Sequence, residues 1–409
     1  TLQPNECVTV RLELPEGYFV KTDTTPWLAW IAIALGIVSV FIAFFMWWFI
    51  GRDDPVVETI EYHAPDGMNC LELAFAYKGH ATNQDVIPLL IELARQGYLS
   101  ISCENKKGTD FSITLIRSSY EGTKENERLF FDGLKKIAAG PVIHKSDLKD
   151  RFYKTPEAIL KTINTPENKT KLFHSNSLNK GWILWVLFGF AYFLPGYQYS
   201  YDWLEVGFGL MSIGVFGVSI YMLCADTRQK LSLLIGAFLL LLSIGLSYLF
   251  VWIPVTYADR FYQLACIVSY IICAILVFFS AFLTKRTPYG TEILGRIRGF
   301  KRFLETAEKE RLEMLVEENP DYFYEILPYT YVLNVSDKWV KNFKSIACEP
   351  PSWYTNDNDS YFDIIAFQHI MNSTIASASN SMTSSPESAS SSGGGFSGGG
   401  SGGGGGGAW

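Results

Sequence analysis

The chain has 409 residues, of which 48% are hydrophobic and 18% are charged, and its net charge is −7. This charge is small for a chain of this size and indicates neither an acidic nor a basic bulk partner. The seven cysteines are scattered without a CxxC pair, so their spacing indicates neither a disulfide framework nor a zinc site.

The first 26 residues contain a strand-like alternation of Val8, Val10, Leu12 and Leu14. A single strand cannot bury its apolar face, so we interpret 1–26 as the end of a truncated extracytoplasmic β domain. The chain begins at Thr1 without a signal peptide, and we expect it to be part of a longer precursor.

Five apolar stretches are long enough to cross a bilayer, which requires about 20 helical residues. They are 27–50, 181–201, 204–225, 231–253 and 261–283. No carboxylate, histidine or basic residue lies deep within any of them, because Asp202, Glu205, Asp226, Asp259 and Arg260 all lie at the edges. An ion-coupled transporter is therefore disfavoured, while transport of a neutral substrate stays open.

The basic residues that flank these stretches predict the orientation, since Lys and Arg favour the cytoplasmic side. Arg52, Lys180, Arg228 and Lys285 fall on one side, whereas the loop 195–203 has no Lys or Arg. We expect a multi-pass protein of a bacterial cytoplasmic membrane, with the N-terminus outside and 51–180 and everything after 284 in the cytoplasm.

The first cytoplasmic segment, 51–180, has the order of a winged helix. A helix capped by Asn69 and ending at Gly79 precedes a helix from Asp85 to Gly97 and strands at 98–103 and 111–116. Further amphipathic helices are expected at 125–139 and 145–163. Residues 52–180 hold 18 Lys plus Arg and 18 Asp plus Glu, so the excess positive charge that binds phosphates is missing. An interaction module is favoured over a membrane-tethered DNA-binding regulator, which remains the alternative.

The segment 284–348 predicts a helical cytoplasmic domain. Ile293, Ile297, Phe300 and Leu304 form an apolar stripe that must pack on another element. Basic residues cluster just after the last span and could contact anionic lipid headgroups, although a positive flank needs no further purpose. These candidate membrane-contact residues are Lys285, Arg286, Arg296, Arg298, Lys301 and Arg302.

Residues 349–409 are acidic, then Ser/Ala-rich, then Gly-rich, and we expect them to be disordered because they offer little apolar surface to bury. Phe396 and Trp409 are isolated aromatic residues in this tail and are candidate contacts for a protein partner.

The chain resembles the bacterial predicted membrane protein family called domain of unknown function 2207, including its YciQ-like C-terminal region. The resemblance covers nearly the whole chain and implies an upstream signal peptide and exoplasmic β domain, but no activity or active-site residues. Ala64 and Pro88 depart from the expected pattern. The resemblance is carried by Leu14-Pro15-Glu16-Gly17-Tyr18-Phe19, Tyr62 with Pro65-Asp66-Gly67, Leu93-Ala94-Arg95-Gln96-Gly97-Tyr98-Leu99, Arg286-Thr287 with Gly290, Gly299-Phe300, Leu327-Pro328-Tyr329, Trp339 with Phe343, and the Gly-rich tail that ends in Trp409.

The sequence thus predicts a mainly α polytopic membrane protein with five spans, a winged-helix-like α+β cytoplasmic domain, a helical C-terminal domain and a disordered tail. Its expected role is a non-enzymatic envelope scaffold or interaction protein that contacts the lipid bilayer and an unknown protein partner. The five histidines are dispersed and no nucleophile motif occurs, so no catalytic, cofactor-binding or metal-ligating residue is predicted.

Overall fold

The computed structural model describes residues 27–103, 105, 107–175, 183–184, 186–187, 214–219, 238–239, 241–243, 260–346, 349–356 and 363–386. It is mainly helical with a small sheet. The chain divides into two compact units, which we call the apolar unit (1–55 and 173–288) and the mixed unit (56–172 and 289–409). The two cytoplasmic domains expected at 51–180 and 284–348 therefore contribute to one compact unit.

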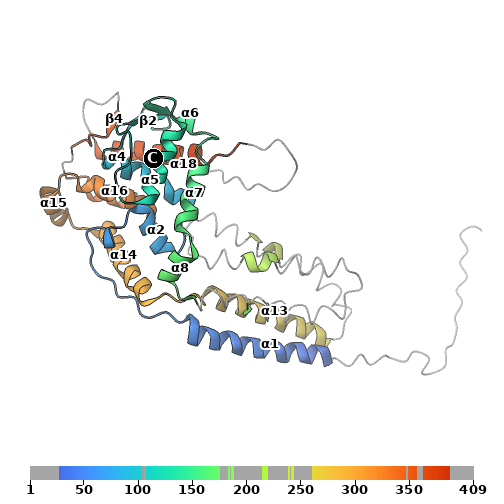
Figure 1. Cartoon of the computed structure of the whole chain (residues 1–409). Coiled ribbons are helices and arrows are strands. Elements are labelled where there is room, and N and C mark those ends of the chain that lie inside the picture. Colours follow the sequence, from blue (N-terminus) through green and yellow to red (C-terminus); the bar gives the residue numbers. More distant parts are fainter. Residues whose placement is uncertain are drawn as a thin grey trace, which may run out of the picture. The chain divides into compact units, whose positions relative to one another are not determined.

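The apolar unit is organised around two long helices that lie side by side, α1 (Trp27–Met46) and α13 (Arg260–Ala281) (Figure 1). A π-helical turn, η1 (Trp47–Gly51), extends α1. Gly36 lies against the side chain of Ile272, the rings of Phe44 and Phe279 are 6.3 Å apart, and Gly51 lies against the backbone of Leu283. The contacts advance in the same direction along both helices, so the two helices are parallel.

Three chain segments meet where both helices end. The Asp53 carboxylate accepts the backbone N–H of Arg286 at 2.8 Å, and Lys285 lies 3.6 Å from Asp54. His174 donates its backbone N–H to the carbonyl of Lys285 at 3.0 Å. All three connections to the mixed unit, at 55–56, 172–173 and 288–289, therefore leave from the same end of the helix pair.

The spans expected from the sequence are confirmed only in part. Helix α1 with η1 coincides with the expected span 27–50, and α13 coincides with 261–283. Among the described residues one helix, Ile33–Gly51, is long and apolar enough to cross a bilayer, and α13 holds a shorter apolar stretch, Ile267–Ser280. The stretches 181–201, 204–225 and 231–253 lie largely outside the described residues, so five spans are not confirmed.

The N-terminal half of the mixed unit follows local signals in the sequence. After the turn η2 (Pro65–Gly67), Asn69 and Glu72 form a reciprocal capping box on α2 (Cys70–Lys78), which ends at Gly79 as expected. The next expected helix is broken at Pro88, which lacks an N–H, into α3 (Asn83–Val86) and α4 (Leu89–Arg95). Helix α5 (Glu125–Ile137) is continuous, whereas 145–163 divides into α6 (Lys145–Leu148) and α7 (Lys154–Ile163), followed by α8 (Pro166–Leu172).

The sheet has four strands in the order β3-β2-β1-β4. Strands β1 (Leu99–Cys103) and β2 (Phe111–Leu115) form the expected antiparallel hairpin, in which Ile101 faces Ile113. Strand β3 (Val142–His144) pairs with β2, and β4 (Tyr354–Asn356) pairs in parallel with β1. Strand β4 lies within 349–409, which the sequence predicted to be disordered.

The C-terminal half begins with α14 (Pro288–Thr306), followed by α15 (Lys309–Glu318), α16 (Tyr322–Val332) and α17 (Ser336–Asn342). Trp339 is fully buried beside Phe323 and Phe343, with ring centroids 6.3 Å and 4.7 Å away. An extended segment, 56–61, which we call the strap, lies along α14. The carbonyls of Val57 and Thr59 in the strap approach α14 at glycines 295 and 299.

The expectation that 349–409 is disordered was wrong for 363–386. Helix α18 (Ile364–Thr383) begins at Asp363, whose carboxylate accepts the backbone N–H groups of residues 365 and 366. It buries an apolar stripe every three to four residues, including Phe367, Met371, Ala378 and Met382. Alanine and serine at many positions concealed this stripe. Residues 387–409, including Phe396 and Trp409, lie outside the described residues.

Candidate functional site: a polar cleft in the mixed unit

A cleft of about 420 Å³ opens in the mixed unit. The turn at η2, the start of α2, the end of α4, the loop 120–124 and helix α16 all contribute to its walls. Its polar lining consists of His63, Asn69, Glu92, Arg95, Gln96, Tyr120, Lys124, Glu127 and Glu325. The volume falls in the range of small-molecule sites, but this lining is far more polar than usual.

Glu127, on α5, lies at the centre of a saturated hydrogen-bond network. Its side chain is almost fully buried, and Oε1 accepts the Asn69 amide at 2.8 Å. Oε2 accepts the Gln96 amide at 3.0 Å and the Tyr120 hydroxyl at 2.8 Å. The Asn69 amide also reaches Asn126 at 2.9 Å. A buried carboxylate that accepts three hydrogen bonds is stabilised without a counter-ion, so this network holds the cleft walls together.

The Glu92–Arg95 ion pair has unused bonding capacity. Arg95 Nη2 lies 3.0 Å from Glu92 Oε1, with side-chain exposures of 31% and 3%. Glu92 Oε2 and Arg95 Nε are both buried and have no hydrogen-bond partner within the described part of the chain. Burial raises the pKa of Glu92, and the attraction of Arg95 opposes that shift. The pair thus leaves one acceptor and one donor unpaired in the cleft wall.

The rim of the cleft is held by further pairs. Lys124 lies 2.5 Å from Glu72, the residue that completes the cap of α2. His63 lies 3.4 Å from Glu325 on α16. The Tyr329 hydroxyl donates to the Met68 carbonyl at 2.9 Å, and its burial raises its pKa, so it remains a donor at neutral pH. Residues about 260 positions apart in the sequence are thus tied together at the rim.

This arrangement is suited to recognition. Within the described ranges, no group of three or more His, Cys, Asp or Glu side chains could hold a metal ion. Cys70 lies beneath the cleft, and burial followed by the charges of Glu92 and Glu127 raises its thiol pKa, so it is not an activated nucleophile. What the cleft offers a ligand is preorganised donors and acceptors.

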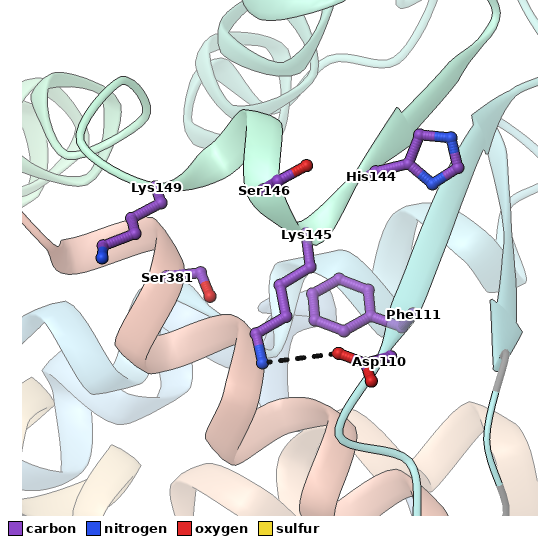
Figure 2. Close-up of a pocket in the computed structure, with 7 residues that line it drawn as sticks. All are labelled: Asp110, Phe111, His144, Lys145, Ser146, Lys149 and Ser381. Atoms are coloured by element: carbon purple, nitrogen blue, oxygen red, sulfur yellow. Dashed lines mark ion pairs between the residues drawn. The ribbon is translucent and has the colours of Figure 1, made fainter.

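A second hollow of about 400 Å³ lies between the sheet and α18, and Figure 2 shows the residues that line it. The Lys145 ammonium lies 3.8 Å from Asp110 and donates to the Thr109 carbonyl at 2.9 Å. His144 and Lys149 are exposed, and Ser381 on α18 donates to its own helix. Its charged side chains are more exposed than Glu92 and Glu127, so this hollow is the weaker candidate.

The candidate membrane-contact residues have different environments. Lys285 and Arg286 belong to the apolar unit, where Arg286 lies over the ring of Phe173 at 4.9 Å. Arg296 binds Glu61 and Asp66 at 2.7 Å and 2.6 Å, and Lys301 is buried over the ring of Tyr77. Only Arg298 and Arg302 among the four on α14 are exposed. The four basic residues of α14 therefore do not form one exposed basic face.

The cleft could not be predicted from the sequence because no single segment contains it. Three of the segments that carry the family resemblance nevertheless contribute to its walls: the turn after Tyr62, the end of α4 with Arg95 and Gln96, and the stretch around Tyr329. The family-like motifs in these three segments are the sequence signal that could have indicated a site.

The described residues thus contain one apolar helix that is long enough to cross a bilayer and a mixed unit of helices with a small sheet. Residues 224–343 match the family model described as the C-terminal domain of predicted membrane protein DUF2207. The resemblance inferred from motifs is thereby confirmed over this segment, which is similar to a family of predicted membrane proteins of unknown function. The segment supplies Glu325 and Tyr329 to the cleft. No curated protein and no solved structure matches the chain.

Proposed function

We propose that the chain is a non-enzymatic envelope protein whose mixed unit binds a partner in the polar cleft. The observation that carries this proposal is the saturation of Glu127 by Asn69, Gln96 and Tyr120 beside the unsatisfied Glu92–Arg95 pair. A saturated carboxylate is poorly suited to proton transfer, but it makes a rigid wall. Glu92 Oε2 and Arg95 Nε are closed to solvent, so a ligand would satisfy both once these side chains shift toward the cleft.

The cleft can be tested with full-length protein captured from native membranes. His63 is 58% exposed at the rim, so His63→Trp narrows the opening, keeps an aromatic ring beside Tyr322 and removes the pair with Glu325. Lys149→Ala in the second hollow is the matched control. We expect a protein or small molecule that copurifies with the wild type and with the control and is depleted by His63→Trp. Equal recovery from all three proteins would sink the proposal for the cleft.

The tail is the second expected partner contact. A chain that ends before Phe396 should lose partners that bind through Phe396 or Trp409 while retaining those that bind in the cleft. Recovery of the same partners from the shortened chain would remove the tail from the proposal.

The proposed location is a bacterial cytoplasmic membrane, with the N-terminus outside and the mixed unit in the cytoplasm. The parallel packing of α1 and α13 supports a multi-pass topology. If both helices span the bilayer, the intervening chain must cross it an odd number of times to return to the start of α13. Three spans at 181–201, 204–225 and 231–253 satisfy this requirement. Reporters after Lys107 and at Gln198 should then respond from opposite compartments, and the same response from both would refute the topology.

A DNA-binding regulator is less well supported. In the winged-helix interpretation α4 would read the DNA groove, but all of its residues from Leu89 to Ala94 are buried. A helix with this burial has little surface left for base edges. Duplex binding by the full-length protein that is micromolar and steeply dependent on salt would restore this alternative.

A further inference from the structure

The strap exposes two aliphatic side chains beside two basic residues. Val57 and Ile60 are 73% and 76% exposed, the highest values among the large hydrophobic residues of the mixed unit that the structure describes. Arg302 is 76% exposed and lies 3.5 Å from Glu58 of the strap, and Arg298 is exposed one turn away on α14. Bulky apolar groups next to arginine are the composition of a surface that enters the lipid headgroup layer.

The backbone of the strap fixes the direction of these side chains. Glycines 295 and 299 admit the carbonyls of Val57 and Thr59 directly against α14, and Arg296 binds Glu61 at 2.7 Å. With its carbonyls facing α14 and its acidic side chains bound by arginines, the strap presents Val57 and Ile60 to the outside. Their exposure therefore follows from ordered packing.

The short chain connections between the strap and the apolar helix indicate that a lipid bilayer covers this surface. Val57 follows Gly51, the last residue of the apolar helix, by six positions, which is at most about 20 Å of extended chain. Tyr289, which is 45% exposed, follows Leu283 by the same number of residues. Gly51 and Leu283 are in contact within the apolar unit. The exposed apolar groups are therefore connected by only six residues of chain to the end of a helix that is long and apolar enough to cross a bilayer.

We propose that the strap and the adjacent face of α14 form a membrane-surface contact in which Val57 and Ile60 enter the headgroup layer and Arg298 and Arg302 bind anionic lipid. A second copy of the chain fits less well, because stable protein interfaces use about 20–30 residues a side. This inference requires insertion in a bilayer and does not depend on partner binding in the cleft.

The test uses full-length protein in lipid nanodiscs, with an environment-sensitive fluorescent amino acid placed at Val57, at Ile60 or at the control position Met314. Met314 is 48% exposed on α15, far from the chain connections in sequence. Lipids that carry a nitroxide on the headgroup should quench positions 57 and 60 about twofold or more above position 314. Equal quenching at all three positions would overturn the proposal.

The role of Arg298 and Arg302 in lipid binding is tested in the same nanodiscs. Replacing phosphatidylcholine with phosphatidylglycerol should increase quenching at position 57, and Arg298→Gln with Arg302→Gln should abolish the increase. An increase that survives both substitutions would remove the two arginines from the contact. Quenching seen only in discs that hold two copies of the protein would identify a protein partner and overturn the lipid assignment.

Discussion

The carbonyl oxygen of Thr59 occupies the space where any residue other than glycine at position 299 would place its Cβ. The strap and α14 therefore approach each other backbone to backbone, which no side chain permits. The same is true four residues earlier, where Gly295 meets the Val57 carbonyl. Two glycines one helical turn apart thus leave room for the backbone of the strap to pack directly on α14.

Gly299→Ala should destabilise the mixed unit. Alanine is the better helix former by about 1 kcal/mol, but the clash with the Thr59 carbonyl forces the strap off the helix, and overpacking of this kind costs about 1–3 kcal/mol. Urea unfolding in detergent micelles measures the change. Gly140→Ala is the matched control, because a Cβ at that position meets no atom within 4 Å. Equal midpoints for the two variants would refute the close approach.

Arg296→Gln should weaken the attachment of the strap. Its guanidinium holds Glu61 at 2.7 Å and Asp66 at 2.6 Å, and its side chain is 26% exposed. Partly exposed pairs contribute about 1 kcal/mol or less, so we expect a loss of that size that diminishes at high salt. Hydrogen exchange in peptides covering 56–67 reports the loss. Arg296→Lys should restore little of the lost protection, since an ammonium cannot make the two parallel hydrogen bonds of a planar guanidinium. Full protection in the lysine variant would contradict this account.

Glu127→Ala should be the most damaging single change at the cleft. It removes the acceptor of the Tyr120 hydroxyl and one acceptor each of the Asn69 and Gln96 amides, which keep Asn126 at 2.9 Å and Glu92 at 3.5 Å. Each buried group left unsatisfied costs about 1–3 kcal/mol. We expect a loss of several kcal/mol by urea unfolding and increased exchange at α2 and α5. Glu125→Ala, on the same helix and 64% exposed, should be close to neutral. Similar stability of the two variants would show that the network is not structural.

The parts of the fold that the sequence predicted are those set by neighbouring residues. The cap at Asn69 and the β1–β2 hairpin follow from signals within about ten positions, and both agree with the structure. The cleft joins residues near 63–127 to Glu325 and Tyr329, and no local pattern specifies that pairing. Helix α18 was missed for a different reason: its buried apolar stripe is interrupted by small side chains such as Ser377, which weakens the hydrophobic periodicity that the sequence displays.

The pH dependence of stability should carry a contribution from Glu92. Burial raises its pKa in the folded state above the ordinary value of 4.5, so the folded protein binds this proton more tightly than the unfolded chain. The stabilising contribution is fully present below about pH 4.5 and is lost as pH rises through the folded pKa. The difference in unfolding free energy between wild type and Glu92→Gln should therefore shift against the wild type as pH rises over this range. A difference that does not change with pH would show that the pKa of Glu92 is not raised.

Thr374→Val should loosen α18 from the hairpin. The Thr374 hydroxyl is fully buried, 2.9 Å from the Ile370 carbonyl of its own helix, 3.1 Å from the Gly108 carbonyl and 3.4 Å from the Cys103 sulfur. Valine keeps the shape but removes the donor, which leaves the Gly108 carbonyl without that partner at a cost of about 1–3 kcal/mol. Hydrogen exchange should rise in peptides covering 99–115 and 364–383 together, because both sides of one contact are released. Thr383→Val, whose hydroxyl bonds only within its own helix at 2.7 Å to Ser379, is the control and should leave the hairpin protected. If both variants raise exchange at 99–115 equally, general weakening of α18 is responsible and the Thr374–Gly108 contact is not what holds the helix in place.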